Sequence, residues 1–144
     1  MLCAKPILLV EDDLVDALAI KRAVRDSNAG DTVIHVRSVQ EALAFLRSPE
    51  NNRPTLILLD LNLPGMNGFT LLRIVKSDPC LRDIPIVALT ASGESQDIYS
   101  SFDLGVAGYM VKSPDYAGLM ETIRTIQDYW SLNQLPACST RRGR

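Results

Sequence analysis

Cysteine and histidine are scarce in this chain of 144 residues: Cys3, Cys80 and Cys138 are scattered along it, and His35 is its single histidine. Three dispersed cysteines form neither a disulfide framework nor the close spacing of a metal site. This usage favours a reducing cytoplasm. A single histidine excludes chemistry that needs two, and we expect His35 to be structural because it lies within a strand-like stretch.

Long apolar runs and an excess of basic charge are also missing. No run approaches the roughly 20 apolar residues that a membrane-spanning helix needs, and no apolar signal segment opens the chain. The formal net charge is −2 and the pI about 5.3, whereas general nucleic-acid binding requires a basic face. We therefore expect a cytoplasmic protein that binds neither membranes nor nucleic acids.

The composition is that of a soluble globular domain, with 47% apolar and 22% charged residues. Short apolar runs alternate with helical patterns, which is typical of repeated βαβ units and a parallel sheet. We expect one domain over 1–131 and a C-terminal tail over 132–144. The predicted strands are 5–10, 32–36, 55–60, 84–89 and 106–111, and the predicted helices begin near residues 13, 38, 67, 94 and 115.

Four of the strands are rich in Val, Ile and Leu without strict alternation, as in a sheet that helices cover on both faces. The strand at 32–36 does alternate, so we place it at an edge. With right-handed crossovers, the predicted fold is α/β, a (βα)5 flavodoxin-like three-layer sandwich with strand order 2-1-3-4-5. In the first helix Leu14, Ala17, Leu18 and Val24 are predicted to face the core.

Polar side chains follow the strands at their carboxyl ends. Glu11 and Asp12 follow the first strand, Asp60 ends the third, and Thr90 and Lys112 follow the last two. These ends share one edge of a parallel sheet, and the predicted strand order puts its switch point between the first and third strands. Carboxylates, a hydroxyl and an ammonium at one edge predict a site for a divalent cation and a phosphoryl group.

The acidic groups predict a Mg²⁺ site. Converging carboxylates raise one another's pKa, and Mg²⁺ resolves the conflict with one or two carboxylates, waters and phosphate oxygens. Asp12 and Asp60 are the expected direct ligands, Glu11 acts through water, and Asn62 supplies its backbone carbonyl. The alternative is that the acids after the first strand only begin a helix, where they suit the helix dipole.

Asp60 is also the best candidate for a nucleophile, because aspartate can form an acyl phosphate and Asp60 ends the central strand. Phosphoryl transfer needs mainly positioning and charge neutralisation. Lys112 would supply a cation and Thr90 a hydroxyl donor, although each alone is most often an ordinary residue at a strand end.

Four motifs in this order resemble the receiver domain of two-component response regulators over residues 5 to about 130. The motifs are Glu11-Asp12, Asp60-x-x-x-Pro64-Gly65-x-x-Gly68, Thr90-Ala91 and Tyr109-x-x-Lys112. The resemblance implies that Asp60 is the phospho-acceptor, that Glu11 and Asp12 are the acidic pair, and that Thr90 and Lys112 sense the phosphate.

The resemblance also implies a switch. Tyr109 would be the aromatic residue whose ring turns inward when Thr90 moves toward the phosphate, shifting the fourth helix and the last strand. The family usually has proline directly after the lysine, but Ser113 intervenes here before Pro114. The isomer of the Ser113–Pro114 bond stays open.

A narrower resemblance links the chain to the small regulators paired with bacterial phytochromes. It rests on Lys112-Ser113, the final helix ending in Tyr129-Trp130, and Leu135-Pro136. Those regulators are stand-alone receivers that often dimerise through the face of the fourth helix, last strand and fifth helix. Trp130 would serve such a homodimer; alternatively, it caps the core of its own domain.

These observations predict a single-domain response regulator with no output domain, phosphorylated by a sensor histidine kinase of the phytochrome type or by a phosphotransfer protein. It would not be an enzyme beyond catalysing its own phosphorylation and dephosphorylation. The resemblance implies that Asn62 and Ser92 position the attacking water in the dephosphorylation. A phosphatase would show a second acid where Asn62 stands. A flavodoxin-like cofactor protein would need a Ser-, Thr- and Gly-rich loop where Glu11-Asp12-Asp13 stand.

Overall fold

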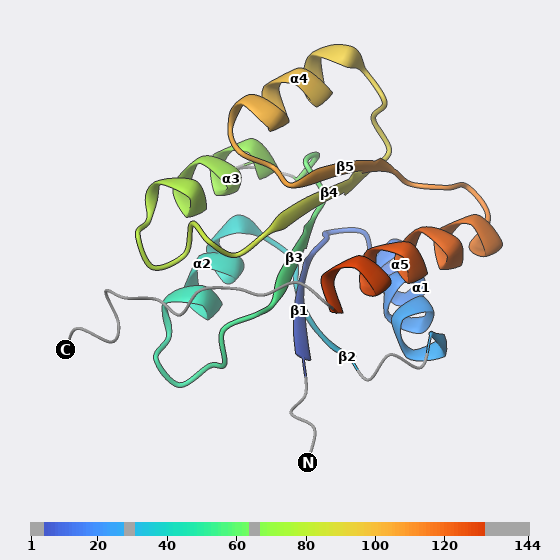
Figure 1. Ribbon diagram of the computed structural model, residues 1–144, viewed down its shortest axis with the longest axis horizontal. Coiled ribbons are helices and arrows are strands. Elements are labelled where there is room, and N and C mark those ends of the chain that lie inside the picture. The colour runs from blue at the N-terminus through green and yellow to red at the C-terminus, as the bar shows by residue number, and fades with distance from the viewer. Residues whose placement is uncertain (1–4, 28–30, 64–66, 132–144) are drawn as a thin grey trace.

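The computed structural model describes residues 5–27, 31–63 and 67–131. Strands and helices alternate along the chain, and the strands form one parallel sheet in the order β2-β1-β3-β4-β5 (Figure 1). The predicted topology is confirmed, with β2 at an edge. The elements are β1 (Lys5–Val10), α1 (Leu14–Asp26), β2 (Asp31–Val36), α2 (Val39–Arg47), β3 (Leu56–Leu59), α3 (Gly68–Ser77), β4 (Ile86–Thr90), α4 (Ser95–Asp103), β5 (Gly108–Val111) and α5 (Tyr116–Ser131).

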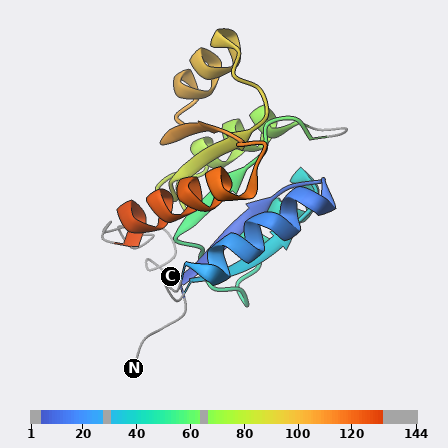
Figure 2. The ribbon, with the colours of Figure 1, turned by 90° about the vertical axis from the view of Figure 1, so that its right-hand side faces the viewer.

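Helices cover the sheet on both faces, because successive side chains of a strand point to opposite sides. On β1, Leu8 and Val10 join the core under α2 and α3. Ile7 and Leu9 join the core under α1 and α5. Figure 2 shows α1 and α5 side by side on one face, with α3 behind the sheet. The three-layer sandwich therefore has two separate cores, and the carboxyl edge of the sheet is left for the site.

The buried face of α1 differs from the prediction. Ala17 and Val24 are buried as expected, but Leu18 is 65% exposed and Leu14 is also exposed, while Ile20 takes the core position. Leu18 lies about 100° around the helix from Ala17, so the two cannot both be central in one stripe. The small residue marks where α1 packs closely, and the large leucines lie at the surface.

Local signals at the helix ends agree with the sequence. The Ser38 hydroxyl accepts a hydrogen bond from the Glu41 amide at 3.1 Å and caps α2. Asn67 caps α3 in the same way, as expected for these residue types. Gly105, with a φ of +102°, ends α4.

Several further predictions concern single features. Within the described residues every peptide bond is trans, including the bond between Ser113 and Pro114. None of the helices described has the length and apolarity to cross a bilayer. Cys80 is a half-buried free thiol. The predicted tail 132–144, Cys3, and Pro64 and Gly65 of the turn after β3 lie outside the described residues.

Candidate functional site

The carboxyl edge of the sheet gathers four of the predicted residues. Glu11 follows β1, Asp60 follows β3, Thr90 ends β4 and Lys112 follows β5. Glu11 is 1% exposed, Asp60 8% and Thr90 fully buried. Ionisable side chains are rarely buried unless they are paired, so we expect these groups to contact one another.

The Lys112 ammonium lies at the centre of this group. It forms an ion pair with Glu11 Oε1 at 2.7 Å and donates hydrogen bonds to Asp16 Oδ2 at 2.7 Å and to Asp60 Oδ2 at 3.2 Å. Three carboxylates therefore share one cation, two of them through hydrogen bonds and Glu11 through the ion pair. The site therefore carries more negative than positive charge when all its groups are ionised.

The pKa values of the central pair follow from that imbalance. Burial raises the pKa of Glu11 to about 7, with the neighbouring Asp60 adding to the effect and Lys112 opposing it. Burial alone would lower the pKa of Lys112, but its contacts with Asp16 and Glu11 outweigh burial and raise that pKa above the ordinary value. Lys112 is thus a permanent cation at neutral pH, while the surplus charge attracts either a proton or a second cation.

Asp60 is held in a fixed orientation. Its Oδ1 accepts hydrogen bonds from the Thr90 hydroxyl at 2.9 Å and from the Asn62 amide at 3.0 Å. Its Oδ2 faces Lys112. The Asn62 side-chain amide in turn lies 3.4 Å from the Thr90 hydroxyl. One oxygen has two donors and the other a cation, so the carboxylate cannot rotate without losing contacts.

Gly68 positions the start of α3 directly against the Asp60 turn. The Gly68 amide donates to the Leu61 carbonyl at 3.1 Å. A methyl group on Gly68 would lie 2.7 Å from the Asp60 carbonyl oxygen and 2.7 Å from the Leu61 Cα. Only glycine permits this close approach of two backbones, which explains the second glycine of the motif after Asp60.

Asp12 does not join the cluster around Lys112. Its Oδ1 lies 3.7 Å from Arg37 Nη2, and both side chains are about half exposed. As they stand, no three Asp, Glu, His or Cys side chains in residues 5–27, 31–63 and 67–131 converge as a metal site. The physical reason is that the Lys112 ammonium lies between Glu11 and Asp60 while Asp12 turns to Arg37.

The donor atoms nevertheless suit a hard cation. Glu11, Asp12 and Asp60 offer only carboxylate oxygens, which Mg²⁺ and Mn²⁺ prefer. The exposed contact between Asp12 and Arg37 is of a kind that contributes little free energy, so Asp12 can leave it at small cost. The surplus negative charge around Lys112 is the observation that favours a cation here.

Tyr109 connects β5 to the loop between β4 and α4. Its ring packs against the core under α2 and α3, and its hydroxyl donates to the Ser92 carbonyl at 2.6 Å. Burial raises the pKa of Tyr109. The Ser92 hydroxyl in turn donates to Asp97 Oδ2 at 2.6 Å. The aromatic ring packs inward against that core, and its hydroxyl ties the last strand to the loop before α4.

Asp16 is the site residue that the sequence did not single out. It lies in the first turn of α1, where acids are common because they suit the helix dipole. No pattern separates it from an ordinary helix-start acid. His35, by contrast, is structural as predicted: its Nε2 lies 2.7 Å from the Glu11 carbonyl oxygen.

The parallel sheet of this strand order, with aspartate, threonine and lysine converging at its switch point, defines a receiver domain. Residues 7–124 match the family described as the response regulator receiver domain. The chain therefore belongs to that family, which confirms the resemblance drawn from its motifs.

Individual relatives indicate which kind of response regulator this chain resembles. The chain is 38% identical over 130 residues to response regulator Rcp1 of Synechocystis sp., a match that covers 88% of each. The structure of phosphorylated cyanobacterial phytochrome response regulator RcpA matches with a TM-score of 0.87 and 39% identity, covering 94% of this chain and all of that one. Rcp1 in its Mn²⁺-bound form gives a TM-score of 0.84 and 36% identity over 92% of this chain and 99% of that one. The chain is thus a response regulator homologous to those associated with phytochromes.

Proposed function

We propose that this protein is a cytoplasmic phospho-acceptor that receives a phosphoryl group on Asp60 from a histidine kinase. The observation that carries the proposal is the environment of Asp60, which is buried, fixed by Thr90 and Asn62, and faces the Lys112 ammonium. Phosphoryl transfer needs a fixed nucleophile and positive charge more than covalent chemistry. These contacts provide both.

In the transfer, an Asp60 carboxylate oxygen forms the new bond to phosphorus as the bond from phosphorus to the donor's imidazole nitrogen breaks. The bonding electron pair leaves with the imidazole, and Asp60 releases no proton because it reacts as the anion. Lys112 would pair with the phosphoryl oxygens and the Thr90 hydroxyl would donate to them. Burial of Asp60 and Thr90 limits the access of water.

A divalent cation would complete the site. Asp12 and Asp60 would hold Mg²⁺ directly, Glu11 through water, and Asn62 through its backbone carbonyl. When bound, Mg²⁺ would neutralise charge on the phosphoryl oxygens. The Mn²⁺-bound form of the relative Rcp1 supports this choice of chemistry.

The protein would catalyse only its own phosphorylation and dephosphorylation. The kinase partner would be of the phytochrome type, because RcpA is a phytochrome response regulator, or a phosphotransfer protein would stand in its place. Leu14, Val15 and Leu18 are exposed on α1, the helix that also carries Asp16 to the site. These three apolar side chains offer a docking surface for the phosphodonor.

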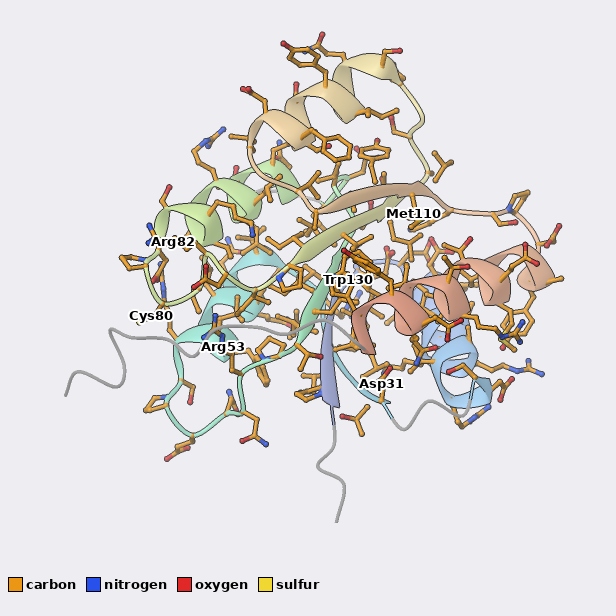
Figure 3. The ribbon with its side chains drawn as sticks, in the orientation of Figure 1. Asp31, Arg53, Cys80, Arg82, Met110 and Trp130 are labelled. Atoms are coloured by element: carbon orange, nitrogen blue, oxygen red, sulfur yellow. The ribbon has the colours of Figure 1, made fainter. Side chains whose placement is uncertain are left out.

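The response would pass through the face of α4, β5 and α5 to a second copy of the chain. Tyr99, Phe102, Val111 and Tyr129 are exposed on these elements. Trp130 instead packs inward against its own core, close to Met110 on the same side of the sheet (Figure 3). The homodimer that we propose therefore depends on the exposed residues rather than on Trp130.

The central test is Asp60→Asn. With a small phosphodonor and Mg²⁺, the variant should take up no label, while Asp103→Asn, an exposed aspartate on α4, should label as the wild type does. Label retained on Asp60→Asn would overturn the proposal.

Sedimentation of free and phosphorylated protein tests the dimer, and a monomer in both states at tens of micromolar would refute it.

A further inference from the structure

Asp16 contacts the functional lysine more closely than the phospho-acceptor does. Its Oδ2 lies 2.7 Å from Lys112 Nζ, whereas Asp60 Oδ2 lies 3.2 Å away. Lys112 is largely buried, but the Asp16 side chain is 41% exposed. The ammonium thus lies nearer to Asp16 and Glu11, each at 2.7 Å, than to Asp60 at the end of the central strand.

The three carboxylates around Lys112 differ in what else they do. Asp60 is the proposed nucleophile and Glu11 a proposed outer ligand of the cation. Asp16 has neither task, so its contact with the ammonium is the one that the reaction leaves undisturbed. We propose that Asp16 is a positioning residue for phosphoryl transfer, which holds the Lys112 ammonium back from Asp60 and keeps that carboxylate available.

The electrostatic reason is competition for one cation. An ammonium in close contact with a carboxylate makes the lone pairs of that carboxylate less available to phosphorus, because the anion is already paired. It also opposes the binding of a divalent cation, because the two positive charges repel each other. Without a carboxylate at position 16, Lys112 would settle on Asp60 and Glu11. The approach of a metal cation to those two carboxylates would then also be opposed by the nearer ammonium.

This role rests on the proposed function, and Lys112 stays protonated throughout. The bond from an Asp60 oxygen to phosphorus still forms as the bond from phosphorus to the donor breaks, and Asp16 takes no part in either. Its effect is on where the ammonium lies before the transfer. Asp16 therefore acts through Lys112 and does not touch the phosphoryl group.

The test compares Asp16→Asn with Asp13→Asn. Asp13 caps α1 with hydrogen bonds to the amides of Val15 and Asp16, and asparagine preserves that role, so the control removes one charge from the same turn. Asp16→Asn should slow phosphorylation by a small phosphodonor about tenfold, as expected for loss of a residue that supports a reacting group. The control should stay near the wild-type rate.

Two further variants distinguish positioning from a structural role. Asp16→Glu, whose carboxylate can still reach the ammonium, should restore most of the rate. In a Lys112→Gln background, Asp16→Asn should cause no additional loss. Mg²⁺ binding, measured by calorimetry without any phosphodonor, should weaken in Asp16→Asn and recover in Asp16→Glu. This measurement does not depend on phosphoryl transfer, so it tests the role of Asp16 even if Lys112→Gln folds poorly.

The outcomes separate the two proposals. Three results would overturn the role of Asp16. They are a wild-type rate and Mg²⁺ affinity in Asp16→Asn, an equal loss of rate in the Lys112→Gln background, and no recovery of rate in Asp16→Glu. Label retained by Asp60→Asn would instead overturn the phospho-acceptor assignment. A loss in Asp16→Asn that disappears without Lys112 supports the inference.

Discussion

Gly68→Ala is a small substitution with a large expected effect, because the added methyl group would meet backbone atoms. It would lie 2.7 Å from the Asp60 carbonyl oxygen and from the Leu61 Cα, while an ordinary contact begins near 3.4 Å. One of the two backbones must therefore give by roughly 0.7 Å. No flexible side chain can absorb the shift, so it falls on the turn that carries Asp60.

The magnitude combines two opposing terms. Overpacking a tight contact costs about 1–3 kcal/mol, while alanine regains up to about 1 kcal/mol over glycine within a helix. We expect the free energy of unfolding to fall by about 1–2 kcal/mol. The effect on phosphorylation should be larger, since a displacement near 1 Å can cost on the order of 10²-fold in rate.

Urea denaturation followed by circular dichroism gives the stability, and labelling by a small phosphodonor gives the rate. Gly93→Ala is the control, because its methyl group would meet only Val111 Cγ2 at an ordinary 3.5 Å. The control should change the unfolding free energy by less than about 0.5 kcal/mol. If Gly68→Ala proves as stable and as fast as Gly93→Ala, the close-approach explanation of Gly68 is wrong.

Three other predictions concern the charges and the aromatic residue. Asp12→Ala should remove Mg²⁺ binding because it deletes a proposed direct ligand, and unchanged calorimetric titration would contradict that role. Without divalent cations, Glu11 should make the protein less stable as pH rises from about 4.5 to about 7. Its pKa is raised from 4.5 to about 7 in the fold, so in this window the folded state holds a proton that the unfolded state has released. The change should be on the order of 3 kcal/mol and absent in Glu11→Gln, as pH-dependent denaturation would show. Tyr109→Phe should lose about 1 kcal/mol of unfolding free energy with its hydrogen bond to Ser92. In an ultraviolet titration it should remove one tyrosine of raised pKa and leave the other, Tyr116, while Asp60 still labels at the wild-type level.

The sequence predicts the sheet and its polar edge well, because both depend on local patterns. Asp60, Thr90 and Lys112 each follow an apolar run, and parallel topology brings such ends together whatever the details of packing. The face of α1 is different. Leu14 and Leu18 look like core residues by type, but which stripe is buried depends on how closely the helix approaches the sheet, and the small Ala17 decides that.

Side-chain partners were the least predictable part of the site. Asp12 turns to Arg37, which follows a different strand, and Asp16 reaches Lys112 across 96 positions of sequence. Neither choice leaves a trace in local spacing. Such pairings depend on charges that meet only after the chain has folded, so the sequence defines the edge of the site but not the arrangement of ions within it.

The hydroxyl of Tyr109 donates a hydrogen bond to the Ser92 carbonyl, and the strength of that bond limits how firmly the proposed switch can hold the ring inward. A net hydrogen bond of about 1 kcal/mol corresponds to roughly a fivefold preference between two states. Under the proposed switch both ring positions would then be accessible, and a phosphoryl group on Asp60 would change their ratio rather than their existence. A partner that selects the inward ring would then bind some unphosphorylated protein, and the proposed signal would have a basal level set by that hydrogen bond.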